Sequence, residues 1–187
     1  MEAVGDLERE RHLRKAPRNL PASLRNVVEY RKSGLSLNHV VGCPLDCGYC
    51  VRHMFDNFEM KRPHLVVDDE EAVSALISHW AFVPHVTPVQ IFNRATDPFL
   101  PLVKQHMLHT LELLDGHGFG NHVLVITRWK VTPEDAERLE RRAALLDRQP
   151  VAGPPREKVR VALLGRAAAR LAAPFALPAA AHAAQRS

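Results

Sequence analysis

A strand-then-helix pattern that repeats three times is the feature that most constrains the fold. The apolar runs 35–41, 88–92 and 122–127 are short, continuous and rich in β-branched residues, which predicts buried strands. Each run is followed by a segment with helical periodicity or a helix start signal, at 69–80, at 102–114 and from Thr132-Pro133 onward. Such alternation is typical of a parallel sheet covered by helices, so we expect an α/β fold. The run 158–164 is a candidate fourth strand.

Length and composition exclude several classes of protein. The chain has 187 residues, enough for one domain with a sizeable core. Its three cysteines are an odd number, which argues against a disulfide framework. The sequence has no apolar run long enough for a membrane span and no secretory signal at its N-terminus, so we expect a cytoplasmic protein with no membrane partner.

The charge divides the chain into three parts. The net charge of +4 separates into +3 for residues 1–32, −6 for 33–140 and +7 for 141–187. We expect 1–32 to be a basic, loosely ordered leader, 33–140 the folded core, and 141–187 an Ala/Arg/Pro-rich tail of doubtful fold. Because the basic excess lies on the flanks, the net charge is weak evidence for a nucleic-acid partner.

The composition changes abruptly after Glu140. Ala-rich, Arg-rich and Pro-rich sequence of this kind often results when a GC-rich gene is read out of frame. We therefore hypothesise that the tail is a frameshift product or a divergent remnant, and that later strand–helix units are missing. The alternative is an authentic Ala-rich helical tail.

All three cysteines lie in one loop, Cys43-Pro-Leu-Asp-Cys47-Gly-Tyr-Cys50, just after the first expected strand. Soft thiolates select iron–sulfur clusters or zinc. Three thiolates bound to a [4Fe–4S] cluster leave one iron open for another ligand. The alternative is a structural zinc site in which His53 supplies the fourth ligand.

The CxxxCxxC spacing, with Tyr49 directly before the last cysteine, resembles the signature of the radical S-adenosylmethionine (SAM) superfamily. The resemblance implies that Cys43, Cys47 and Cys50 hold a [4Fe–4S] cluster, that its fourth iron binds SAM, and that Tyr49 packs near the adenine. It also implies reductive cleavage of SAM to a 5′-deoxyadenosyl radical, with a flavodoxin- or ferredoxin-type electron donor. The implied fold is a partial (β/α) barrel, of which this chain offers three clear units and a candidate fourth strand.

Residues 28–140 resemble more narrowly the spore photoproduct lyase-like branch of that superfamily. The matching motifs are Asn93-Arg-Ala-Thr-Asp97-Pro and Ile126-Thr-Arg128, which line the SAM pocket in that branch. The implied cofactor-binding residues are Asn93, Thr96, Asp97, Arg128 and Lys130. The branch has lysine where Arg128 stands, so Lys130 is an alternative donor. The chain lacks a further cysteine as hydrogen donor, which argues against photoproduct repair.

Two other functions remain open at this stage. The chain could be a truncated, inactive iron–sulfur-binding remnant, or a Cys3His zinc-binding interaction module. The substrate is unknown, and nucleic acid enters only by analogy with the family. The eleven histidines form no recognised metal motif, so we expect most of them at surface or half-buried positions.

Overall fold

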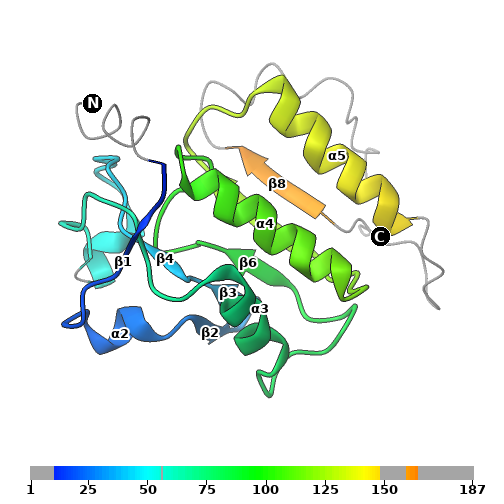
Figure 1. Cartoon of the computed structure of the whole chain (residues 1–187), viewed down its shortest axis with the longest axis horizontal. Coiled ribbons are helices and arrows are strands. Elements are labelled where there is room, and N and C mark those ends of the chain that lie inside the picture. Colours follow the sequence, from blue (N-terminus) through cyan, green and yellow to red (C-terminus); the bar gives the residue numbers. More distant parts are fainter. Residues whose placement is uncertain (1–10, 56, 148–158, 164–187) are drawn as a thin grey trace, which may run out of the picture.

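The chain folds into two sheets with helices packed against them. The computed structural model describes residues 11–55, 57–147 and 159–163. A five-stranded sheet has the order β2-β3-β6-β7-β8, and a three-stranded sheet has the order β1-β5-β4. Figure 1 shows the small sheet at the left, and α5 and β8 at the upper right.

The large sheet contains the predicted parallel strands. Its parallel members are β3 (Gly34–Leu37), β6 (Val89–Ile91), β7 (Val123–Thr127) and β8 (Val159–Leu163). The helices that alternate with them are α3 (Asp69–Ile77), α4 (Val103–Gly116) and α5 (Pro133–Asp147). The structure is thus mixed α/β, with three strand–helix units, and β8 lies within the run 158–164 that was a candidate fourth strand.

Two predicted elements differ in extent. The prediction of a single strand over 35–41 is wrong. The segment contains two strands, β3 and β4 (Val40–Val41), which belong to different sheets. The break falls at Asn38 and His39, both buried polar residues that hydrogen-bond side chains elsewhere. The helix expected over 69–80 ends at Ile77, because the chain turns away through Ser78 and His79.

The described part of the leader is also more ordered than expected. Residues 11–32 contain β1 (Arg14–Lys15), α2 (Ala22–Arg25) and β2 (Val28–Arg31), and they bury Leu20 and Leu24. β2 pairs with β3 in antiparallel register across the two-residue turn Lys32-Ser33. Gly34 has a φ of 125°, and a Cβ there would lie 2.2 Å from the carbonyl oxygen of Pro88, so only glycine fits. The sequence pattern missed β2 because this strand is defined by its pairing with β3 across the hairpin and not by its own periodicity.

The helix starts follow from local chemistry. Asp68 caps α3 by accepting a hydrogen bond from the backbone N–H of Glu71, and acidic residues fill the first turn. Thr132 and Asp135 form a reciprocal capping box before α5, each side chain accepting from the other's backbone N–H. Pro133 occupies the first helical position, where no N–H is needed.

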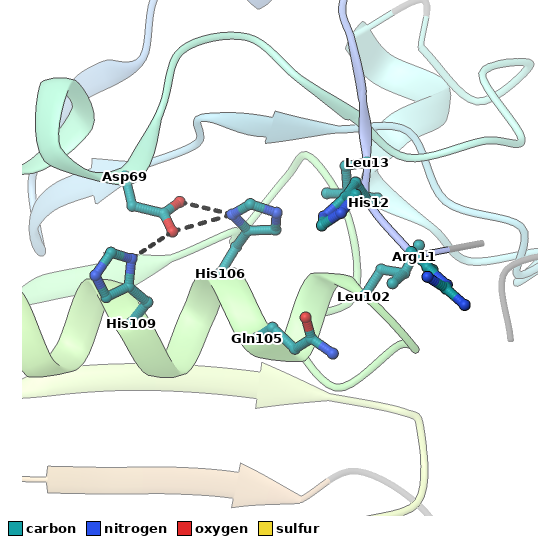
Figure 2. A pocket seen from close by; sticks show the side chains of 8 residues that line it. All are labelled: Arg11, His12, Leu13, Asp69, Leu102, Gln105, His106 and His109. Carbon is teal, nitrogen blue, oxygen red and sulfur yellow. Dashed lines mark hydrogen bonds and ion pairs between the residues drawn. The ribbon is translucent and has the colours of Figure 1, made fainter.

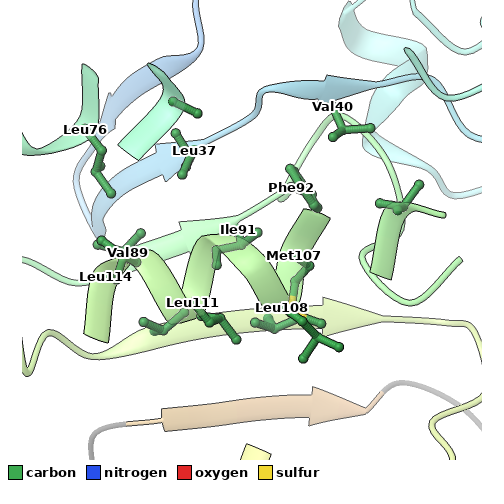
Figure 3. Packing of buried hydrophobic residues seen from close by; sticks show 14 of the residues in the cluster. Leu37, Val40, Leu76, Val89, Ile91, Phe92, Met107, Leu108, Leu111 and Leu114 are labelled. Atoms are coloured by element: carbon green, nitrogen blue, oxygen red, sulfur yellow. The ribbon is translucent and has the colours of Figure 1, made fainter. Parts of the chain in front are cut away.

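One apolar core joins the large sheet to α3 and α4. Val89 and Ile91 on β6 pack against Met107, Leu111 and Leu114 on α4 (Figure 3). These side chains are at most 3% exposed, so each contributes on the order of 2 kcal/mol of burial free energy. The remaining elements are η1 (Val51–Phe55) and β5 (His64–Leu65), which pairs with both β4 and β1.

Within the described ranges the strands do not close into a barrel, so the partial barrel stays a prediction. The tail prediction falls mainly on residues 148–158 and 164–187, which lie outside the described residues. In the part of the chain that the structure covers, every helix is too short or too polar to cross a bilayer.

Candidate cofactor site

The cysteine loop begins where β4 ends, and Gly42 makes that exit possible. Gly42 has a φ of 99°, and a Cβ at this position would lie 2.1 Å from the carbonyl oxygen of Arg62. The backbone N–H of Gly42 donates to Ala95, and that of Cys43 donates to Met60. The first cysteine is therefore fixed by backbone contacts to both the loop after β6 and the far end of its own loop.

A buried arginine anchors the rest of the cysteine loop. Arg52 is 2% exposed, and its guanidinium donates hydrogen bonds to the carbonyl oxygens of Cys43, Asn57, Phe58 and Met60 at 2.6–3.0 Å. A buried charge is costly unless it is paired or hydrogen-bonded. Here one cation binds four carbonyls from two ends of the loop. The sequence analysis missed Arg52, which nothing in the CxxxCxxC spacing indicates.

Aromatic side chains of this loop pack against one another. Phe58 stacks on the ring of His53 with centroids 3.6 Å apart, and the Lys61 ammonium lies 3.6 Å from the Phe58 centroid. Lys61 also donates to Asp46 at 2.6 Å. His53, the fourth ligand of the alternative zinc site, is thus held against Phe58.

The cysteines differ in burial. Cys43 is buried, whereas Cys47 and Cys50 are partly exposed. Burial raises the pKa of the Cys43 thiol, although hydrogen bonding from Leu45 and the charge of Arg52 act in the opposite direction. Burial also raises the pKa of Cys47, and the positive charge of Arg128 opposes that shift. Both arginines therefore favour the thiolate form that metals require.

Asp97 ties the loop after β6 to the end of β7. Its carboxylate accepts hydrogen bonds from the Thr127 hydroxyl at 2.7 Å and from the backbone N–H of Arg128 at 2.6 Å. It also accepts from the backbone N–H groups of Phe99 and Trp129. Each of the two carboxylate oxygens therefore accepts two hydrogen bonds. Asp97 is suited to holding the carboxyl ends of β6 and β7 in register.

Tyr49, inside the cysteine loop, contacts Arg128, which directly follows β7. The Arg128 guanidinium carbon lies 3.9 Å from the Tyr49 ring centroid, and Arg128 donates a hydrogen bond to the Tyr49 hydroxyl. Tyr49 is 70% exposed, and Arg128 is exposed as well. Two residues that are 79 positions apart in the sequence thus come together at one edge of the sheet. Lys130 is exposed two residues beyond.

Asn93 and Thr96 lie in the same loop as Asp97. Asn93 donates to the side-chain oxygen of Gln90, whose own amide donates to Ser33. The Thr96 hydroxyl is buried and is without a hydrogen-bond partner among the described residues. A buried, unsatisfied hydroxyl costs about 1–3 kcal/mol, so it calls for an explanation. Phe92, just before this loop, has a strained φ of 56°.

The three cysteine thiols and the neighbouring side chains determine which metal group could bind in this loop. A mononuclear zinc ion needs its ligand atoms about 2.0–2.3 Å from one point. Among the described residues no three His, Cys, Asp or Glu side chains are arranged to hold a metal ion. A [4Fe–4S] cluster binds each cysteine through a different iron, so its three thiolates stand farther apart than ligands of a single ion. Two of the three thiols, those of Cys47 and Cys50, are partly open to solvent, and the Cys43 thiol is buried.

A second polar centre was missed by sequence reasoning. Asp69, at the start of α3, accepts hydrogen bonds from His39, His106 and His109, each at 2.9 Å (Figure 2 shows the latter two). Burial alone would raise the pKa of Asp69, but the three histidines outweigh it and hold that pKa well below its usual range. The only sequence signal was the His106/His109 pair, three apart on one helix. Its acidic partner lies 37 residues away.

Comparisons with protein-family models, with curated proteins and with solved structures found no match to this chain.

Proposed function

We propose that this chain is a radical SAM protein of the spore photoproduct lyase-like type. Cys43, Cys47 and Cys50 would hold a [4Fe–4S] cluster. When bound, that cluster and SAM would supply reductive cleavage of SAM and a 5′-deoxyadenosyl radical for an unknown substrate. The proposal includes a cytoplasmic location and a flavodoxin- or ferredoxin-type electron donor. A nucleic-acid substrate has only the family analogy behind it.

The anchored cysteine loop is the observation that carries this proposal. Arg52 binds carbonyls at both ends of the loop and so fixes the loop internally. A backbone hydrogen bond donated by Gly42 and the contact of Arg128 with Tyr49 link the loop to the segments that follow β6 and β7 at the carboxyl edge of the parallel sheet. Ligands in open α/β sheets bind at that edge. Tyr49, Asp97 and Arg128 also lie there, joined by the contacts described above. Spacing, loop position and neighbouring residues therefore support the same function.

The chain's own residues would have distinct tasks. The cysteine thiolates would ligate the irons, and the charges of Arg52 and Arg128 would favour their deprotonation. Tyr49 would shield one side of the site with its ring, which Arg128 holds in place. The Thr96 hydroxyl would play its implied part in SAM binding only if the loop after β6 shifts, since it is buried and lacks a partner among the described residues. Asp97 would keep the two strand ends in register rather than contact SAM, since its oxygens are occupied.

Anaerobic reconstitution tests the proposal. We expect the full chain to take up about four irons, as the cubane cluster requires, to show the cluster's visible absorbance, and to form 5′-deoxyadenosine when reduced with SAM. Cys47→Ala should lose the cluster. Met54→Ala is the matched control, because Met54 lies in the same loop and is 80% exposed. It should retain the iron.

Three results would contradict the proposal or a part of it. Iron at the unmodified stoichiometry in Cys47→Ala would refute the ligand assignment. A cluster that never cleaves SAM would identify an inactive remnant instead of an enzyme. Zinc bound in place of iron, and lost in both Cys47→Ala and His53→Ala, would identify the zinc-binding module.

A further inference from the structure

The strand β2 forms one edge of the large sheet, on the side away from β8, and its outer side has no backbone partner among the described residues (Figure 1). The register with β3 and the hydrogen bond from Asn38 to Val27 show that the odd-numbered residues of this strand bond inward. The N–H and C=O groups of Val28 and Tyr30 therefore point outward. A row of such unpaired groups is a template for another strand.

We propose that this edge pairs in antiparallel register with the β2 strand of a second copy of the chain. The contact is isologous, because a two-fold axis presents the same strand from both copies, and it joins two five-stranded sheets into one. The proposal uses none of the cysteine-loop residues and does not rest on the proposed function.

The charges on β2 select both the partner and the register. An axis at Glu29 or at Arg31 would place like charges directly opposite each other, which is destabilising. An axis at Val28 places Glu29 opposite Val27 and forms no charge pair. An axis at Tyr30 places Glu29 opposite the Arg31 of the second copy, and symmetry repeats that pair on the other side. The strand is therefore complementary in charge to itself in one register.

The same register suits the backbone and the side chains. The outward groups of Tyr30 meet those of the second Tyr30 on the axis and can exchange two hydrogen bonds. Glu29 and Arg31 then fall at the positions where antiparallel side chains approach most closely. Within one copy these two side chains already form an ion pair at 2.8 Å, and they are 27% and 28% exposed. A second copy can thus reach both and extend the pair into a network of four charges.

Tyr30 and Trp80 form an exposed aromatic pair beside this edge. Their ring centroids lie 5.2 Å apart, and the two residues are 57% and 80% exposed. Residues opposite each other in an antiparallel pair lie on the same face of the sheet. With Tyr30 on the axis, the aromatic pairs of both copies therefore gather on one face. The dimer removes aromatic surface from water, which favours association.

Sedimentation equilibrium of the purified full chain tests the dimer. We expect a reversible equilibrium between a single chain of 21.0 kDa and a dimer of twice that mass. Hydrogen exchange measured by NMR tests the strand pairing itself. As the protein concentration rises, the outward amides of Val28 and Tyr30 should exchange about tenfold more slowly. The inward amides of Glu29 and Arg31, which already face β3, should change much less.

Two variants should weaken the pairing and leave the hydrogen bonds between β2 and β3 in place. Tyr30→Pro removes an outward N–H, and proline is tolerated where the N–H of an edge strand faces solvent. Arg31→Glu places a like charge opposite Glu29 on both sides of the axis. Each should raise the dimer dissociation constant about tenfold. Circular dichroism would verify that both variants fold.

Matched controls separate the edge from the rest of the surface. Arg141→Glu makes the same charge change on α5, where Arg141 lies 3.7 Å from Glu137, and should alter the dissociation constant by less than about twofold. Trp80→Ala should weaken the dimer by removing half of each aromatic pair. Met54→Ala should not, although Met54 is also 80% exposed.

Two results would overturn the proposal. A chain that stays monomeric at about 100 μM, well above the μM-to-pM range of specific interfaces, would leave the edge to a strand of a different protein. A dimer that persists in both Tyr30→Pro and Arg31→Glu, or one that leaves the exchange of the Tyr30 amide unchanged, would show that the copies associate through another surface.

Discussion

Two buried charges organise two different regions of this molecule. In the cysteine loop, the cation Arg52 binds four backbone carbonyls. At the start of α3, the anion Asp69 binds three histidine side chains. Backbone carbonyls do not titrate and arginine stays charged, so the first network is insensitive to pH. The second consists entirely of titratable groups. The chain thus combines a loop whose hydrogen bonds do not depend on pH with a centre whose hydrogen bonds do.

The largest expected effect comes from removing the cation. Arg52→Ala should lower the free energy of unfolding by about 3–5 kcal/mol, because four carbonyls lose a charged donor inside the protein. Chemical denaturation would measure it. Arg138→Ala, which removes an exposed ion pair with Glu112, is the control and should cost less than about 1 kcal/mol. Equal costs for the two variants would show that Arg52 does not anchor the loop.

Removing the anion should have a smaller effect. Asp69→Asn keeps the size of the side chain and one acceptor, but it loses the charge that holds three histidines. We expect a loss of about 2 kcal/mol at neutral pH, since charge-assisted hydrogen bonds are worth about 1.5–3 kcal/mol each and some are retained. Thermal unfolding would measure the loss. A variant as stable as the unmodified chain would contradict the role of Asp69.

The pH dependence of these two losses sharpens the comparison. The hydrogen bond with Asp69 raises the pKa of His109, so the stability it provides is complete below the unfolded histidine value of about 6.5 and is lost as pH rises through the folded pKa. The lowered pKa of Asp69 provides stability above the unfolded value of about 3.9, which is lost as acid titrates the folded group. The cost of Asp69→Asn should therefore be greatest between about pH 4 and 6.5 and decline on both sides. The cost of Arg52→Ala should be constant from pH 5 to 8.

The smallest effect concerns the surface of the cysteine loop. Arg128→Lys should change the free energy of unfolding by less than about 1 kcal/mol, because the contact with Tyr49 is exposed. Under the proposed function the same change should leave SAM binding largely unchanged, since the branch that this chain resembles has lysine at this position. Equilibrium dialysis with the reconstituted chain would measure the affinity. A large loss of stability would assign Arg128 to the fold instead.

The two regions also differ in what the sequence reveals. The cysteine loop was visible because its residues are close in the chain and their spacing has a chemical meaning. The continuous apolar strands and capped helices were visible because their periodicity is local. The Asp69 centre was hidden because its members come from β3–β4, α3 and α4 and meet only through packing. The same reason applies to β2, whose pairing depends on the hairpin at Gly34, and to the break at Asn38 and His39.

The central claim is that the three cysteines hold a cluster with one iron open to SAM. Electron paramagnetic resonance of the anaerobically reconstituted and reduced chain tests this most directly, because a ligand bound to the open iron alters the signal of the cluster. We predict a [4Fe–4S]⁺ spectrum that changes when SAM is added and is absent in Cys47→Ala. A cluster spectrum that SAM leaves unchanged, or a chain that holds no paramagnetic iron, would contradict the account.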